Sequence, residues 1–165
     1  GRRLESEEDY LRALGVLRRP PAVNHWKSDE EYGRQRLFGT NPMAIRGLGT
    51  GPSLPEDLAK SANDVLSTLY DTNLKKAESA GRIFETDFTG VLEDVVQRQV
   101  TRGATLSGTR SLFYVMPHGG VMPLAIRLET ASTASCVVNP LDARPRWLLA
   151  KAHANSAETH DHEGL

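Results

Sequence analysis

The side chains with the greatest capacity for chemistry gather near the C-terminal end of the chain. Three histidines and two carboxylates occupy a ten-residue span there: His153, Glu158, His160, Asp161 and His162. Imidazole and carboxylate groups are common ligands of zinc and non-haem iron, so a metal site is the first chemistry to consider. Ligands on a helix share a face when they are three or four residues apart. His160 and His162 are two apart, so they diverge on a helix, although they would converge on a strand.

Glu158 and His162 are the members of this group whose spacing would place them on one helical face. Two ligands fall short of the three or four that a zinc site takes. We therefore expect a polar, partly disordered end to the chain, with adventitious weak metal binding as the alternative. Adjacent carboxylates elsewhere, such as Glu30 and Glu31, are typical of a solvated helix surface.

The other candidate residues favour structural roles. His118 lies in a Pro-His-Gly-Gly sequence that predicts a solvated turn. His25 adjoins Trp26, and we expect a structural histidine beside a buried aromatic ring rather than a catalytic one. Cys136 is the only cysteine, which excludes an internal disulfide, and its apolar neighbours predict a small core residue. The sequence thus predicts no catalytic residue, no cofactor-binding residue and no metal ligand in this chain.

The composition is that of an ordinary globular protein. The chain has 165 residues and a formal net charge of −1, which predicts one domain and gives no general attraction to nucleic acid. No apolar run approaches the roughly 18–20 residues of a membrane-spanning helix. Because the chain starts at Gly1 and its first methionine is Met43, we expect a fragment, a processed product or part of a longer protein. Nothing favours secretion, and an organelle is one alternative for its compartment.

Residues 1–23 are expected to form an arm or linker. A helix is expected to begin at Ser28, because Ser28 and Glu31 have the spacing of a capping box. Glu30 and Arg34 have the spacing of a favourable ion pair on that helix. Gly39, with Pro42 three residues later, predicts where this helix ends.

Three more helices are expected further along the chain, and a last one leads to the histidines. A helix with Pro55 as its first residue carries an apolar stripe at helical spacing: Leu58, Ala62, Val65, Leu66 and Leu69. A short polar helix is expected over residues 73–80 and another short one near residues 91–96. The last helix is expected to begin at Trp147, after Pro145.

The clearest β signal is a hairpin near residues 109–128. Residues 111–116 are rich in β-forming side chains, a Gly-Gly turn follows, and residues 121–128 are apolar again. Residues 82–87 predict a short strand or extended link, and residues 136–139 predict a third strand. The expected fold class is therefore mainly α with a small antiparallel β-sheet.

Three stretches, taken in order, resemble the lipoxygenase family. In the last, a Pro-Leu-Ala-Ile-Arg-Leu strand at residues 123–128 precedes a Trp-Leu-Leu-Ala-Lys helix at residues 147–151. The middle one is the Arg-Ile-Phe sequence and the aspartate within residues 82–87. The first has family-like residues in order: Trp26, Asp29, Tyr32, Gln35, Leu37, Gly39, Asn41, Pro42 and Ile45. The similarity covers residues 24–163, so residues 24–165 are interpreted as a truncated lipoxygenase-like domain.

The resemblance implies a mostly helical catalytic domain with a small antiparallel sheet. In that family a non-haem iron removes hydrogen from the bis-allylic carbon of a polyunsaturated fatty acid, and dioxygen adds to give a hydroperoxide. Histidines, usually an asparagine or histidine, and the C-terminal carboxylate hold the iron. Here His162 and Glu163 resemble a pair that precedes the first ligand, which would fall just after Leu165. Gly164 departs from the leucine that is usual in the family.

Two hypotheses follow from this resemblance. The first is a non-catalytic, lipoxygenase-derived chain without the iron site, serving as an accessory or structural subunit of a larger assembly. The alternative is the N-terminal portion of a lipoxygenase that dioxygenates polyunsaturated fatty acids, with iron ligands supplied by a missing or separate segment. Under either hypothesis we expect this chain to be inactive alone. We also expect other protein chains to cover the apolar face left open by the missing half.

Overall fold

The computed structural model describes residues 25–39, 41–90, 107–129 and 135–163, without the side chains of residues 162 and 163. The expected arm over residues 1–23 and the expected helix near residues 91–96 lie outside these ranges. Within them the elements follow in the order α2 (Asp29–Phe38), β1 (Arg46–Gly47), α3 (Glu56–Leu69), α4 (Leu74–Ser79), β2 (Ile83–Asp87), β3 (Gly108–Val115), β4 (Val121–Glu129), β5 (Cys136–Val138) and α6 (Arg144–Glu163). None of these helices is both long and apolar enough to cross a bilayer.

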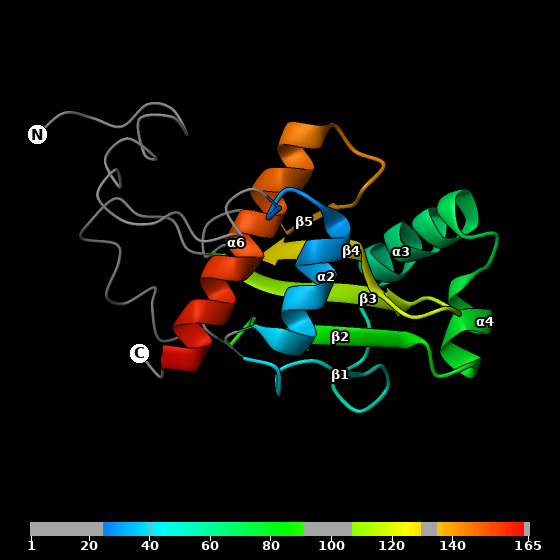
Figure 1. Ribbon diagram of the computed structural model, residues 1–165, viewed down its shortest axis with the longest axis horizontal. Helices are drawn as coiled ribbons and strands as arrows, with labels where there is room; N and C mark the ends of the chain where they lie inside the picture. The colour runs from blue at the N-terminus through cyan, green and yellow to red at the C-terminus, as the bar shows by residue number, and fades with distance from the viewer. Residues whose placement is uncertain (1–24, 40, 91–106, 130–134, 164–165) are drawn as a thin grey trace, which may run out of the picture.

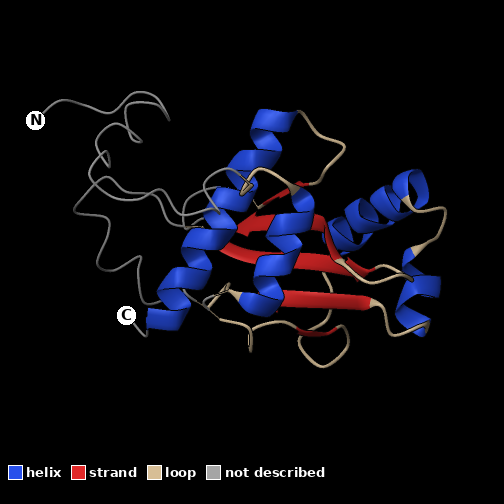
Figure 2. Ribbon diagram, in the orientation of Figure 1, coloured by secondary structure: helices blue, strands red, loops and turns tan. Residues whose placement is uncertain are grey.

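The strands form one five-stranded antiparallel sheet in the order β1-β2-β3-β4-β5, which Figure 2 shows in red at the centre of the described part. The predicted hairpin is confirmed as β3 and β4, with Val115 paired to Val121 across the turn. Gly119 and Gly120 turn the chain there with φ values of 90° and 89°, a region that favours glycine. The predicted strands near residues 82–87 and 136–139 are confirmed as β2 and β5.

Helices cover both faces of this sheet. On β3, successive side chains point to opposite faces, as strand geometry requires. Leu112 and Tyr114 join a core with α3 and α4, whereas Phe113 joins a second core with α2 and α6. Figure 1 shows α2 and α6 side by side across one face of the sheet, running in the same direction. The described part is therefore a three-layer arrangement with the sheet in the middle.

The expectation of a mainly helical chain with a small sheet is only partly met. Helices hold more of the described residues than strands do, but the sheet has five strands and organises both cores. The expected open apolar face is not a face of the sheet. Among the described residues, the large apolar side chains left exposed are Leu37, Phe38, Met43, Leu69, Leu141 and Leu149.

The start of α2 follows the predicted capping chemistry in one of its two halves. Ser28 Oγ accepts a hydrogen bond from the Glu31 amide at 2.9 Å. The Glu31 carboxylate does not accept the second capping hydrogen bond from the Ser28 amide, because it binds the Arg34 guanidinium at 2.7 Å. The expected pair of Glu30 with Arg34 is therefore wrong, and Arg34 takes the acid three residues away. The helix ends at Phe38, as predicted.

The apolar stripe on α3 is confirmed at four of its five positions, because Leu69 at the helix end is half exposed. Pro55 was predicted to be the first residue of this helix, but it is the N-cap, and the helix begins at Glu56. Asn73 caps α4 by accepting a hydrogen bond from the Lys76 amide at 2.9 Å, and the helix closes before Gly81. The last helix, α6, begins at Arg144, ahead of the predicted start at Trp147.

Candidate functional site

The C-terminal candidates whose side chains are described, His153, Glu158, His160 and Asp161, do not converge on a metal site. Iron in an oxygenase takes at least three protein ligands, and the described residues contain no group of three His, Cys, Asp or Glu side chains that could hold a metal ion. The residues described here therefore do not fit an iron centre. Glu158 is buried and faces Arg36, so it is not directed at the neighbouring histidines. The partly disordered end is also wrong within the described ranges, because α6 continues to Glu163.

Two of the other candidate residues differ from their predictions. Cys136 is exposed rather than buried, because it begins the edge strand β5, and the residues that pack against the two cores are the following ones, Val137 and Val138. His25 is exposed too, and its carbonyl accepts the Ser28 amide at 2.9 Å in the turn before α2. His118 lies exposed in the hairpin turn, as predicted. None of the three contacts another potential ligand closely enough to form a metal-binding group within the described residues.

Polar groups instead converge where α2 meets the N-terminal half of α6. Asp29 Oδ1 accepts hydrogen bonds from Trp147 Nε1 at 2.7 Å and from Lys151 Nζ at 2.8 Å. Trp147 and Lys151 lie four residues apart, so both reach the same face of α6. Lys151 is fully buried (0 % exposed) and also donates to the Lys27 carbonyl at 2.8 Å. A buried ammonium group needs such partners, because burial removes its water.

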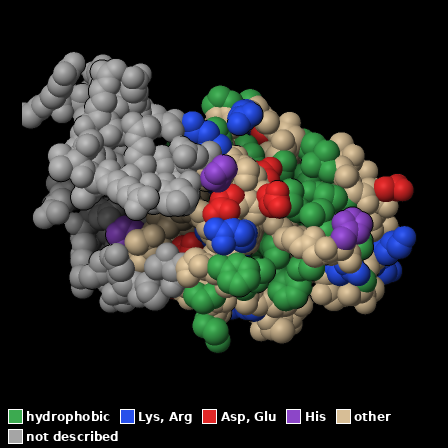
Figure 3. All heavy atoms as spheres, in the orientation of Figure 1, with side chains coloured by type: hydrophobic (Ala, Val, Ile, Leu, Met, Phe, Trp, Pro, Cys, Tyr) green, Lys and Arg blue, Asp and Glu red, His purple; other side chains and the backbone are tan. Residues whose placement is uncertain are grey.

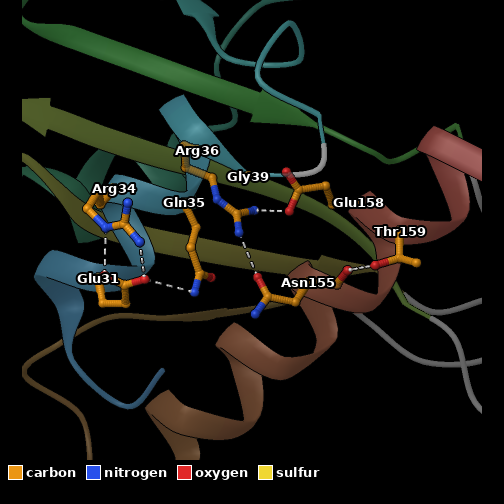
Figure 4. Close-up of a pocket in the computed structure, with 8 residues that line it drawn as sticks. All are labelled: Glu31, Arg34, Gln35, Arg36, Gly39, Asn155, Glu158 and Thr159. Atoms are coloured by element: carbon orange, nitrogen blue, oxygen red, sulfur yellow. Dashed lines mark hydrogen bonds and ion pairs between the residues drawn. The ribbon is translucent and has the colours of Figure 1, made fainter. Parts of the chain in front are cut away.

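A second polar contact joins α2 to the C-terminal half of α6. Arg36 is 2 % exposed, and its Nη1 lies 2.6 Å from Glu158 Oε2. Its Nη2 donates to Asn155 Oδ1 at 2.7 Å. Figure 4 shows the Arg36 side chain leaving α2 and pointing toward both α6 residues. The guanidinium carbon also lies 4.6 Å from the centroid of the Tyr32 ring, a favourable cation–π distance.

Tyr32 connects these two contacts to the sheet. Its ring is buried between α2 and β3 and stacks on Phe113 with the ring centroids 6.0 Å apart. The Lys151 ammonium lies 5.7 Å from the centroid of the same ring. Burial raises the pKa of the Tyr32 phenol above its ordinary value, with the Arg36 charge opposing the effect. The phenol is thus held in its neutral form.

Gly33 allows α2 to approach the sheet closely. A Cβ atom at this position would lie 1.7 Å from the carbonyl oxygen of Val121 on β4. No side chain can be accommodated at that separation without moving the helix or the strand. The position of α2 is therefore fixed by backbone contact with the sheet, and α6 is fixed to α2 by the two polar contacts.

A polar pocket of about 390 Å³ opens beside the second contact. It is lined by residues of both helices and the end of α2: Glu31, Arg34, Gln35, Arg36, Gly39, Asn155, Glu158 and Thr159. The two acids and the two arginines in this lining pair with each other, Glu31 with Arg34 and Glu158 with Arg36. The Arg34 guanidinium lowers the pKa of Glu31, opposed by partial desolvation. The lining therefore has no excess charge that would select an ionic ligand.

The surface that carries α2 and α6 reflects this balance. In Figure 3, acidic and basic side chains lie together near the middle of the described face, and apolar side chains form patches beside them.

A separate buried cluster anchors the connector between α2 and α3. Glu85 is fully buried on β2 and accepts hydrogen bonds from Arg110 at 2.7 and 2.9 Å and from Arg46 at 3.1 Å. Arg110 also donates to the carbonyls of Pro52 and Ser53 at 2.7 and 2.9 Å. The connector between α2 and α3 is therefore held to the sheet by side-chain hydrogen bonds, with the carboxylate of Glu85 as an acceptor for both arginines.

Sequence reasoning named Asp29, Tyr32, Trp147 and Lys151 as residues of a family pattern but did not predict that they meet. Asp29 and Lys151 are 122 residues apart in the chain. The available signal was their chemistry: a lysine among apolar residues of a core-facing helix needs a carboxylate or carbonyl partner. Which partner it has depends on the packing of α2 against α6.

Comparisons with known proteins identify the family. A family model described as Lipoxygenase matches residues 19–165. The mouse protein named polyunsaturated fatty acid lipoxygenase ALOX15 is 33% identical over 149 residues, covering 85% of this chain and 21% of that protein. The human protein named hydroperoxide isomerase ALOXE3 is 32% identical over 144 residues, covering 86% of this chain and 20% of that protein.

A solved structure shows the same fold. It is the structure of a calcium-dependent 11R-lipoxygenase, which matches with a TM-score of 0.68 and 28% sequence identity. The match covers 86% of this chain and 21% of that one. The chain described here thus spans about a fifth of the length of the relatives that it matches.

Proposed function

Because this chain belongs to the lipoxygenase family, we propose that it forms the part of a lipoxygenase catalytic domain that precedes the iron ligands. Together with the polypeptide that carries those ligands, it would dioxygenate polyunsaturated fatty acids. The observation that carries this proposal is the family match over residues 19–165. Within this proposal, residues 24–165 belong to the catalytic domain and residues 1–23 form a linker ahead of it.

The role that we propose for the described residues is to build and position the scaffold. Non-haem iron supplies the one-electron and dioxygen chemistry of such oxygenases when it is bound. The described residues do not form its site, so no chemical step is assigned to them. Their contribution is a sheet covered on both faces and a 20-residue helix, α6, held against it by buried polar contacts.

Two other functions compete with this proposal. An accessory, non-catalytic subunit would have the same family membership, but no contact or comparison favours it specifically. A fatty-acid hydroperoxide isomerase is favoured by one observation, the 32% identity to a relative of that name. The two enzymatic functions differ in substrate, because one consumes dioxygen with a free fatty acid and the other rearranges a hydroperoxide already formed.

The test is to purify the protein at its natural length from its source and assay it with linoleic acid. Dioxygen uptake and the ultraviolet absorbance of the conjugated diene would be recorded together. Oleic acid is the matched control, because it has no bis-allylic carbon. The proposal expects both signals with linoleic acid and neither with oleic acid.

The same preparation separates the competing functions. Loss of linoleic acid hydroperoxide without dioxygen uptake, and no reaction with linoleic acid itself, would establish the isomerase instead. No reaction with linoleic acid or with its hydroperoxide, in a preparation that contains no iron, would support the accessory, non-catalytic subunit. The 165-residue chain on its own is expected to be inactive with linoleic acid, with oleic acid and with linoleic acid hydroperoxide.

A further inference from the structure

Two ion pairs join α2 to α6 in the same order along both helices, one buried on both sides and one in which the lysine is buried and the acid is partly exposed. Asp29 pairs with Lys151 at 2.8 Å, and Arg36 pairs with Glu158 at 2.6 Å. The step from the first pair to the second is seven residues on each helix, which is two helical turns. The two helices therefore lie parallel, as Figure 1 shows, with their contacts in a matched repeat.

The charges of the two pairs alternate in opposite senses. Along α2 the acid comes first and the base second, whereas along α6 the base, Lys151, comes before the acid, Glu158. A slip of α6 by seven residues would place an acid against an acid or a base against a base. An antiparallel arrangement would do both, with Asp29 against Glu158 and Arg36 against Lys151. Like charges opposed in a buried interface are strongly unfavourable.

The residues on the inner face of α6 differ in size and polarity along the helix. Trp147 is buried there together with the small residues Ala150, Ala154 and Ala157. A slip of α6 by four residues would bring Lys151 to the place of Trp147 and Glu158 to the place of Ala154. Both charges would then lie among apolar groups without their partners, which is costly.

We propose that the two ion pairs, Asp29 with Lys151 and Arg36 with Glu158, specify the parallel register of α6 against α2. A buried ion pair contributes little net stability compared with an apolar pair of similar volume, and its best-attested role is to select one arrangement over others. In the proposed lipoxygenase these four side chains are positioning residues, because they set where α6 presents its C-terminal residues. That consequence rests on the proposed function, whereas the register does not.

The test measures register directly with spin labels on the 165-residue chain. Cys136 is exposed and would first be replaced by serine, and labels would be placed at Glu30 and Ser156, which are also exposed. The test variant removes all four charges with substitutions of similar shape: Asp29→Asn, Arg36→Met, Lys151→Met and Glu158→Gln. The matched control removes the charges of a pair that lies within α2 and has an exposed arginine, by Glu31→Gln with Arg34→Met.

The expected result is one label distance in the parent and in the control. In the four-charge variant, helix content by circular dichroism is retained and a second distance appears. A slip of one turn moves α6 by about 5 Å along its axis, so the second label distance should differ from the first by no more than about 5 Å. A single, unshifted distance in that variant would overturn the proposal. Loss of helix content would also overturn it, because the pairs would then act on stability rather than on register.

This outcome is independent of the proposed function. The label distance depends on neither iron nor fatty acid, so a chain that fails the oxygenation assay can still show the expected second distance. Conversely, an active lipoxygenase in which the four-charge variant keeps one distance would refute only the role of the ion pairs.

Discussion

The two faces of the sheet are covered in different ways. On one face, α3 and α4 pack through apolar side chains such as Leu58, Val65 and Leu66, all of them fully buried. On the other face, α2 and α6 pack through apolar residues of mixed size, from Tyr32 and Trp147 to alanines, and through the buried charges of Lys151 and Arg36. The same strands serve both faces, since side chains alternate along β3.

The difference shows how one sheet can separate stability from orientation. Burial of apolar area stabilises whichever arrangement achieves it, so the α3 face depends mainly on volume. Buried charges are favourable only when each one meets its partner, so the α6 face depends on which residues are opposite each other. We therefore expect α3 to tolerate conservative apolar exchange and α6 to be intolerant of unpaired charge.

The largest expected effect is on the charged face. Glu158→Gln would leave the buried Arg36 guanidinium without its counter-charge, and we expect a loss of about 3–5 kcal/mol in the free energy of unfolding. Urea unfolding followed by circular dichroism would measure it. The control is the double variant Arg36→Met with Glu158→Leu, which removes both charges and should lose far less. Equal losses in the single and double variants would contradict the account.

The corresponding change on the apolar face is Leu66→Ala. Leu66 is fully buried, so the truncation removes packed volume, and we expect a loss of about 2–5 kcal/mol from transfer and cavity terms. Leu66→Met keeps the volume and should lose under about 1.5 kcal/mol in the same unfolding assay. A methionine variant as unstable as the alanine variant would mean that this face, too, requires specific contacts.

A smaller, pH-dependent effect is expected from Tyr32 at the centre of the charged face. Burial raises its pKa above the ordinary value of 10.0. Above pH 10 the unfolded phenol ionises while the folded one stays neutral, so the stabilisation present below pH 10 declines as the pH rises. Unfolding free energies measured on both sides of this pH should show the decline, and Tyr32→Phe should reduce it. An identical decline in the phenylalanine variant would assign it to other groups.

The smallest effect is expected at the exposed pair beside the pocket. Arg34→Ala removes the guanidinium that lowers the pKa of Glu31, so the pKa of Glu31 should rise toward its ordinary value of 4.5. The unfolding free energy should be indistinguishable from that of the parent, because the arginine is exposed and its ion pair is screened by water. A side-chain NMR titration measures the first expectation and urea unfolding the second. A clear loss of stability would mean that the pocket lining supports the fold.

The contrast between the two faces also explains what could be predicted from sequence. The stripe on α3, the Ser28 cap of α2 and the Gly-Gly hairpin follow from local spacing and turn chemistry, and each was predicted. The five-stranded sheet was only partly predicted, because the pairing of β1 with β2 and the coverage of β3 on both faces depend on distant segments.

The charged face could not be predicted in the same way. Arg36 and Asn155 are 119 residues apart in the chain. The sequence around Glu158 does not show whether its carboxylate binds a buried arginine or a metal ion, and the structure places it against Arg36. Cys136 was wrongly predicted to be buried, because apolar neighbours indicate a strand but do not show that it lies at the edge of a sheet. The family resemblance named Asp29, Trp147 and Lys151 but neither Arg36 nor Glu158, and the structure showed how all five pair.

The most direct test of the central claim, that this chain is part of a lipoxygenase catalytic domain, is native mass spectrometry of the protein isolated from its source. The measurement reads the masses of all associated chains and any bound iron in one spectrum. We predict an iron-containing species in which this chain is joined to, or associated with, polypeptide that carries the iron-ligating histidines. An iron-free species, with this chain among subunits unrelated to lipoxygenases, would contradict the claim.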